Sequence, residues 1–175
     1  SILEYRGQIK EVQKIATRQL SSSILYFCNR RKEGLPYIIN FISAEGNEGK
    51  SELIKNLEEY WSSIGLKVRT LSWNTDFQAT SRKYSLAKSV TDLYASTGED
   101  MLIVEYPNLR EANISSDLLQ EANLNLLIAR ADRGWKETDK LLAERLKQQA
   151  GKTPMYFYLT HASRNVVEDY TGMLP

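Results

Sequence analysis

The sequence predicts an α/β fold in which a mainly parallel sheet carries helices on both faces. Short, nearly continuous apolar runs are typical of strands buried on both faces, and they alternate with segments of helical periodicity. No repeat, low-complexity tract or long Pro/Gly/Ser linker divides the 175 residues, a length that suits one domain. We therefore predict a single domain over 1–175, with a leading helix or helices over 1–33 and an α/β core over 37–175.

The first element is expected to be a long helix from about Leu3 to Cys28. Its apolar residues recur at spacings of three and four, which places them on one helical face: Ile9, Val12, Ile15, Ala16, Leu20, Ile24 and Phe27. The run Ser21-Ser22-Ser23 is a candidate break in this helix. A charged turn over 29–34 follows.

The first strand is expected over 37–42, because Tyr37-Ile38-Ile39-Asn40-Phe41-Ile42 is almost wholly apolar. A loop over 43–49 leads into a helix from Lys50 to about Ile64, which ends at Gly65. A second strand is expected over 67–73.

The second half of the chain continues the alternation. A helix is expected over 80–96, with Leu86, Val90, Leu93 and Tyr94 on one side, and a third strand over 101–105. A short helix over 116–122 precedes a fourth strand over 124–129. The last helix, over 135–149, is expected to turn Leu141, Leu142 and Leu146 inward, and a fifth strand covers 155–160.

Composition excludes several classes of function. The 23 Lys and Arg against 22 Asp and Glu give a net charge of +1, which argues against a general nucleic-acid binder. One Cys and one His exclude a disulfide framework, a Cys-based zinc site and a His-rich metal site. No apolar run approaches the ~20 residues needed to span a bilayer. The start at Ser1 and the abrupt stop at Pro175 lead us to expect a piece excised from a longer membrane protein.

The loop after the first strand carries the clearest chemical motif. The Walker A pattern is G-x-x-x-x-G-K-[ST], and this chain supplies Ala44-x-x-x-x-Gly49-Lys50-Ser51. Such a loop cradles phosphates with backbone N–H groups at a helix N-terminus. Lys50 would reach the β- and γ-phosphates, and the Ser51 hydroxyl would ligate Mg²⁺. The alternative is a plain strand-to-helix turn with an incidental Gly-Lys-Ser.

The loop and its surroundings resemble the cytoplasmic domain of bacterial tyrosine kinases of the polysaccharide copolymerase group, within the MinD/ParA-like P-loop class. That family writes its loop as S-x-x-P-G-E-G-K-[ST], and five positions match: Ser43, Glu48, Gly49, Lys50 and Ser51. Gly46 replaces the family's Pro and Asn47 its Gly. Glu45 stands where the wider class often has a Lys.

The resemblance extends over almost the whole chain. The segment 124–131 is similar to the family's strand D-x-V-L-L-V-V-R-A, and 155–170 to its last strand, loop and closing helix. In that loop Thr160-His161-Ala162 would border the adenine, although a lone loop His is more often only a surface residue. Of the family's ring-forming E-x-x-R-x-x-R helix motif only Arg18 remains, with Ile15 and Ser21 at the outer positions.

The departures from the family concern its metal-binding carboxylates. Its D-x-D positions hold Ser72 and Asn74, and its Walker B Asp is replaced by Glu105. Ser and Asn cannot neutralise a dication, and Glu is longer by one methylene than Asp. Asp76 could substitute. Glu105 could equally be a solvated strand-end carboxylate, and Arg130 and Arg133 are expected to lie in solvated turns.

The resemblance implies ATP or ADP with Mg²⁺ as cofactor, bound through Glu48, Gly49, Lys50 and Ser51, with Ser51 on the metal. Glu105 and Asp76 are the candidate catalytic residues. The implied function is that of a degenerate, pseudokinase-like P-loop domain that regulates or scaffolds exopolysaccharide and capsule chain-length control and export. The alternatives are an active tyrosine autokinase or ATPase with a rearranged metal site, and a stand-alone MinD-like positioning ATPase. Whether the domain is an enzyme stays open.

The resemblance also implies a location and partners. We expect the cytoplasmic side of the bacterial inner membrane, with this fragment itself soluble. The expected partner is the membrane-spanning part of the same or another polysaccharide export protein, and no nucleic acid. Because two of the three ring-contact positions are replaced, we expect a monomer or weak oligomer.

Overall fold

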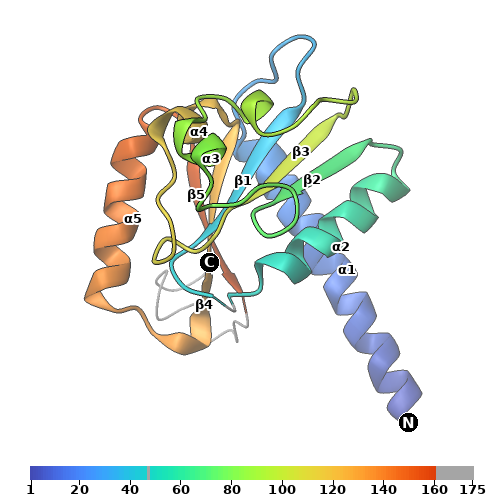
Figure 1. Ribbon diagram of the computed structural model, residues 1–175. Helices are drawn as coiled ribbons and strands as arrows, with labels where there is room; N and C mark the ends of the chain where they lie inside the picture. Colours follow the sequence, from blue (N-terminus) through green and yellow to red (C-terminus); the bar gives the residue numbers. More distant parts are fainter. Residues whose placement is uncertain (47, 161–175) are drawn as a thin grey trace.

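A five-stranded, wholly parallel sheet forms the centre of the protein (Figure 1). The computed structural model describes residues 1–46 and 48–160. Its strands lie in the order β2-β3-β1-β4-β5 and have these bounds: β1 Tyr37–Ser43, β2 Val68–Ser72, β3 Met101–Glu105, β4 Leu124–Arg130 and β5 Met155–Thr160. The predicted α/β class with a parallel sheet is confirmed, and every predicted strand is present.

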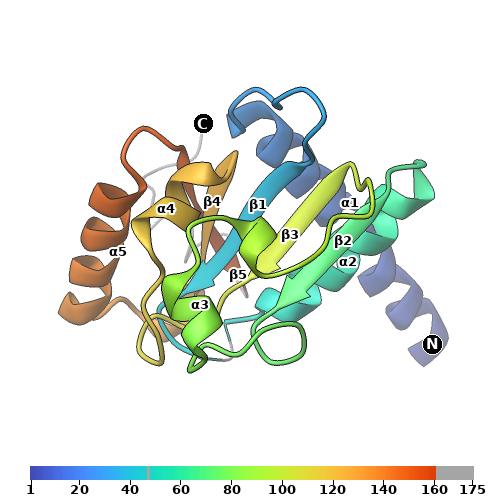
Figure 2. The ribbon, with the colours of Figure 1, turned by 45° about the horizontal axis from the view of Figure 1, so that its top comes forward.

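Helices cover both faces of this sheet and complete three layers (Figure 2). The helices are α1 Ile2–Phe27, α2 Lys50–Ser63, α3 Arg82–Leu86, α4 Ser116–Glu121 and α5 Glu137–Ala150, with 3₁₀ turns η1 Val90–Asp92 and η2 Ala131–Arg133. One hydrophobic cluster joins α1 and α2 to one face, and a second joins α3, α4 and α5 to the other.

The strands are buried on both faces, which is why they appear in the sequence as continuous apolar runs. In β1, Ile39 and Phe41 belong to the cluster under α1 and α2, whereas Ile38 and Ile42 belong to the opposite cluster. This alternation is the two-residue period of a strand. One polar exception is Asn40, which is fully buried and donates through Nδ2 to Asn125 Oδ1 of β4 at 2.9 Å.

The leading helix α1 runs unbroken through the serine run, so the predicted break is absent. Ser21 is buried, and its Oγ accepts a hydrogen bond from Trp61 Nε1 of α2 at 2.8 Å. Only the second half of α1 packs on the domain, through Thr17, Leu20, Ser21 and Ile24. The first half projects away from the sheet (Figure 1), and Val12 there is 65% exposed. The predicted apolar face therefore continues beyond the part that is covered.

The predicted helix over 80–96 is wrong. The segment forms only α3 and the turn η1, separated by Ala87 in an extended conformation. Ser89 and Asp92 form a capping box, and Glu121 of α4 accepts hydrogen bonds from Ser89 Oγ and Val90 N. The side chains of Asp92 and Glu121 thus accept hydrogen bonds from backbone N–H groups that would bond to carbonyls in a continuous helix. Leu86, predicted to share one side of a helix with Val90 and Leu93, is 64% exposed, whereas those two residues are buried.

The predicted inward face of the last helix is partly wrong. Leu146 is buried as expected and Leu142 is half-buried, but Leu141 is 58% exposed. Ala143 and Ala150 are buried instead, because the helix turns a small-residue stripe toward α4 and the sheet. No helix among the described residues is long and apolar enough to cross a membrane.

Candidate phosphate-binding site

The Walker A-like loop lies at the carboxyl edge of the sheet, between the end of β1 and the start of α2. Gly49 is the N-cap of α2 with φ +87°, a backbone conformation that L side chains rarely adopt. A Cβ added there would also lie 3.4 Å from Thr160 Cγ2 of β5. The glycine therefore lets the chain turn sharply into α2, whose 14 residues direct a positive helix end toward the loop.

Lys50 reaches from the first turn of α2 to the neighbouring strand end. Its Nζ donates to the Tyr106 carbonyl at 2.5 Å, directly after β3. Burial lowers the pKa of Lys50 to about 8, although the negative charges of Glu105, Glu111 and Glu48 act in the opposite direction. The ammonium group therefore lies beside the loop and loses its proton at a lower pH than an exposed lysine does.

Ser51 and Glu105, which the sequence predicted as metal and catalytic residues, are in direct contact. Ser51 Oγ donates to Glu105 Oε1 at 2.8 Å, and Ser72 Oγ donates to Glu105 Oε2 at 3.0 Å. Glu105 is buried, so it is not a solvated strand-end carboxylate. Parallel strands β2 and β3 pair Ser72 with Glu105 in register, which brings the two side chains together.

Asp76, the other predicted catalytic residue, lies in the turn after β2. Its Oδ2 accepts from Ser72 N at 2.8 Å, and its Oδ1 lies 3.9 Å from Arg69. Asn74 Oδ1 lies 2.8 Å from the Ser72 hydroxyl. Among the described residues, Ser72 connects Asp76 with Glu105, and the Asp76 carboxylate caps the local turn.

Glu48, predicted to bind the cofactor, has its side chain turned into the protein. Its Oε1 lies 2.6 Å from Arg133, and its Oε2 accepts from Arg130 N at 2.6 Å. Its own carbonyl accepts from Thr160 Oγ1 at 2.8 Å. This carboxylate fastens the loop to the ends of β4 and β5, so any cofactor contact from Glu48 would come from its backbone.

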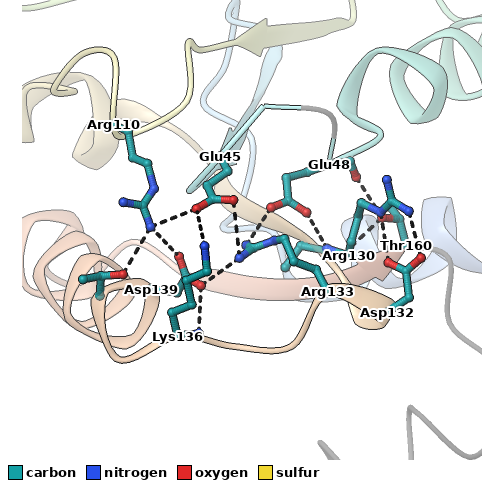
Figure 3. Close-up of polar contacts among 11 residues, drawn as sticks. Glu45, Glu48, Arg110, Arg130, Asp132, Arg133, Lys136, Asp139 and Thr160 are labelled. Carbon is teal, nitrogen blue, oxygen red and sulfur yellow. Dashed lines mark hydrogen bonds and ion pairs between the residues drawn. The ribbon is translucent and has the colours of Figure 1, made fainter.

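A network of ion pairs flanks the loop, and the sequence did not indicate it (Figure 3). Arg133, expected in a solvated turn, is mostly buried and pairs with Glu45, Glu48 and Asp139. Arg130, also expected in a solvated turn, is the last residue of β4, and its partly exposed guanidinium pairs with Asp132. Buried Asp139 also receives hydrogen bonds from Arg110 and Lys136 N. Burial acts to raise the pKa of Asp139, but the hydrogen bond from Lys136 N and the guanidinium of Arg133 outweigh it and lower the pKa.

The donor set suits a magnesium ion in part. Hydroxyl and carboxylate oxygens are the ligands that Mg²⁺ accepts, and Ser51 and Glu105 present both kinds at the N-terminus of α2. Among the described residues, no group of three or more His, Cys, Asp or Glu side chains could hold a metal. Any Mg²⁺ here would therefore rely on Ser51, on Glu105 and on the phosphates that it accompanies. His161 lies outside the described residues, as does Asn47 of the loop.

Comparison with known proteins adds evidence on the fold. No family model and none of the curated proteins matches the sequence. Among solved structures, the kinase domain of Escherichia coli tyrosine kinase ETK is similar, with 15% identity, a TM-score of 0.59, and coverage of 82% of this chain and 73% of that chain. A possible uridine kinase from Bacillus stearothermophilus also matches, with 9% identity, a TM-score of 0.47, and coverage of 85% and 100%. The chain has a P-loop kinase-like α/β fold.

Proposed function

We propose that this domain binds the phosphates of ADP or ATP with Mg²⁺ at the loop over 43–51, and that it acts as a regulatory or scaffolding domain with little phosphotransfer. The observation that carries this proposal is the contact of Ser51 with Glu105 beside the ammonium of Lys50. These three groups meet at the N-terminus of α2, where anions are stabilised.

Each residue would have a separate role in binding. Lys50 would exchange the Tyr106 carbonyl for a phosphate oxygen and supply a positive charge. Ser51 Oγ would ligate Mg²⁺, and Glu105 would orient that hydroxyl and hold the ion's water. The metal, when bound, neutralises part of the phosphate charge.

Slow phosphotransfer follows from the groups that surround Glu105. Transfer to a hydroxyl requires a group that accepts its proton, and the metal needs carboxylates to hold it. Ser72 and Asn74 offer only neutral oxygens, and Asp76 is occupied by Ser72 N and Arg69. Of the two candidate catalytic carboxylates this leaves Glu105, which already accepts two hydroxyl hydrogen bonds.

An active tyrosine autokinase or ATPase is the second candidate function. One observation favours it: the hydroxyl and backbone of Ser72 connect Glu105 with Asp76, so two carboxylates share one corner of the sheet. A small rearrangement of the turn after β2 would direct Asp76 toward the metal. Mg²⁺-dependent transfer of phosphate from ATP to tyrosine would favour this candidate over the first.

The cellular role is proposed on the sequence resemblance together with the kinase-like fold. We place the domain in exopolysaccharide and capsule chain-length control, at the cytoplasmic side of the bacterial inner membrane. Its partner there would be the membrane-spanning part of the same or another export protein. The proposal includes no nucleic-acid partner, in keeping with the net charge of +1.

Titration calorimetry with ADP and ATP, with and without Mg²⁺, tests the proposed function. We expect micromolar binding, about −8 kcal/mol, that Lys50→Ala weakens by about a hundredfold. Lys55→Ala on the exposed face of α2 is the control for loss of one charge and should bind as the wild type does. Absence of heat at millimolar nucleotide would overturn the proposal.

A further inference from the structure

Three cations from separate segments surround the carboxylate of Glu45 (Figure 3). Arg110 lies 3.0 Å from Glu45 Oε1, Lys136 lies 3.5 Å from the same oxygen, and Arg133 lies 3.6 Å from Oε2. Arg110 follows β3, Arg133 belongs to η2 after β4, and Lys136 precedes α5. The fold thus gathers three cations around one carboxylate.

These three cations border the loop that would hold the phosphates, because Glu45 belongs to that loop. Glu45 belongs to the loop, and its neighbour Gly46 approaches the segment after β3, since a Cβ there would lie 3.8 Å from Asn108 Nδ2. Asn108 Oδ1 accepts from Arg110 N, so that segment is ordered around Arg110. Lys50, whose counterpart in such loops contacts the β- and γ-phosphates, donates to Tyr106 of the same segment.

Of the three carboxylates in the network, that of Glu45 is the one that an incoming phosphate could displace. Glu48 and Asp139 have fully buried carboxylates, and each also accepts a backbone hydrogen bond, from Arg130 N and Lys136 N respectively. Glu45 is 25% exposed, and the interactions recorded for its carboxylate among the described residues are with side chains alone. Three carboxylates balance three cations, so an incoming phosphate is accommodated only if Glu45 leaves.

We propose that Arg110, Arg133 and Lys136 form a site for a terminal phosphate group, and that Glu45 fills it. With Glu45 in place, a diphosphate contacts Lys50 without meeting this carboxylate, whereas a third phosphate is repelled by it. The loop therefore selects nucleoside diphosphates over triphosphates, and Glu45 determines that specificity. This inference rests on the proposed function, because it requires a nucleotide in the loop.

The test compares the dissociation constants of ADP and a non-hydrolysable ATP analogue, both with Mg²⁺. The wild type should bind ADP at least as tightly as the analogue. Glu45→Gln should tighten binding of the analogue by about tenfold and change ADP binding little, since it removes the negative charge that occupies the site between the three cations. Glu144→Gln on the exposed side of α5 removes the same charge elsewhere and should change neither constant.

A second substitution identifies the cations. Adding Arg110→Gln to Glu45→Gln should remove most of the gain for the analogue, because a donor of the proposed site is lost. If Glu45→Gln does not fold, the wild-type preference still decides, since a wild type that binds the analogue about tenfold more tightly than ADP contradicts a filled site.

The outcomes separate the two proposals. If ADP binds through Lys50 but Glu45→Gln behaves like Glu144→Gln, the inference fails and the proposed function stands. If neither the wild type nor Glu45→Gln binds either nucleotide, the proposed function fails and the inference fails with it.

Discussion

Lys50 is the residue whose protonation should control the chemistry of the loop. Its pKa is lowered to about 8 by burial, so its positive charge is present below this pH and is lost as the pH rises through it. Since the cation attracts phosphate, nucleotide affinity should fall above about pH 8. Titrations at increasing pH check this, and Lys50→Arg should flatten the dependence because Arg keeps its charge. An unchanged affinity far into alkaline pH would contradict the role of Lys50.

Glu48 should contribute more to stability than Glu45, although both belong to the same loop. Glu48→Ala removes a buried carboxylate that pairs with Arg133 and accepts from Arg130 N, and removal of one member of a buried pair costs about 3 kcal/mol. Glu45→Ala removes partly exposed ion pairs, for which about 1 kcal/mol or less is expected. Urea unfolding of both variants measures the difference. Equal, small losses would show that Glu48 does not fasten the loop.

Whether a site residue can be recognised in the sequence depends on how far away in the chain its partners lie. Gly49, Lys50 and Ser51 follow one another, so their motif is visible in the sequence, and Glu105 is visible as a carboxylate ending an apolar run. The partners of Glu45 cannot be read in this way, since Lys136 lies 91 positions away. Arg133 looks like a turn residue until the fold places two buried carboxylates beside it.

At the scale of elements, α1 combines two halves with different energetic roles. Ile24 is fully buried between α2 and the sheet, so Ile24→Ala should cost about 3 kcal/mol through lost burial and a cavity. Val12→Ala in the projecting half should cost well under 1 kcal/mol, because that side chain is already in water. Urea unfolding of the isolated domain tests both. A large loss from Val12→Ala would mean that this half of α1 is covered in solution.

Hydrogen bonds between polar side chains of different elements explain features that hydrophobic periodicity does not predict, such as the buried asparagines and the interrupted helix over 80–96. Asn40 and Asn125 pair between β1 and β4, and Asn125 Nδ2 also donates to the Leu119 carbonyl of α4. Similarly, Glu121 of α4 accepts a hydrogen bond from the backbone N–H of Val90, which is then not available to continue a helix from α3. Such partners come from other elements, and a pattern within one segment does not contain them.

For the whole molecule, we expect a monomer or a weak oligomer. Two of the three positions expected to bind a neighbouring subunit carry Ile15 and Ser21, and Ser21 is turned inward to accept from Trp61. Light scattering at several concentrations should give the mass of one chain, rising only slightly when concentrated. A stable octamer would contradict this expectation.

The sequence by itself determined the five strands, the position of the loop between the first strand and its helix, and the choice of Lys50, Ser51 and Glu105 as candidate site residues. Each of these depends on patterns within a few consecutive residues. The tertiary structure alone decided which charges meet. Because β1 lies between β3 and β4, the loop that follows it is flanked by the segments carrying Arg110 and Arg133, and a balanced ion network forms at the carboxyl edge. Strand order, which no local pattern specifies, therefore sets the electrostatics of the site.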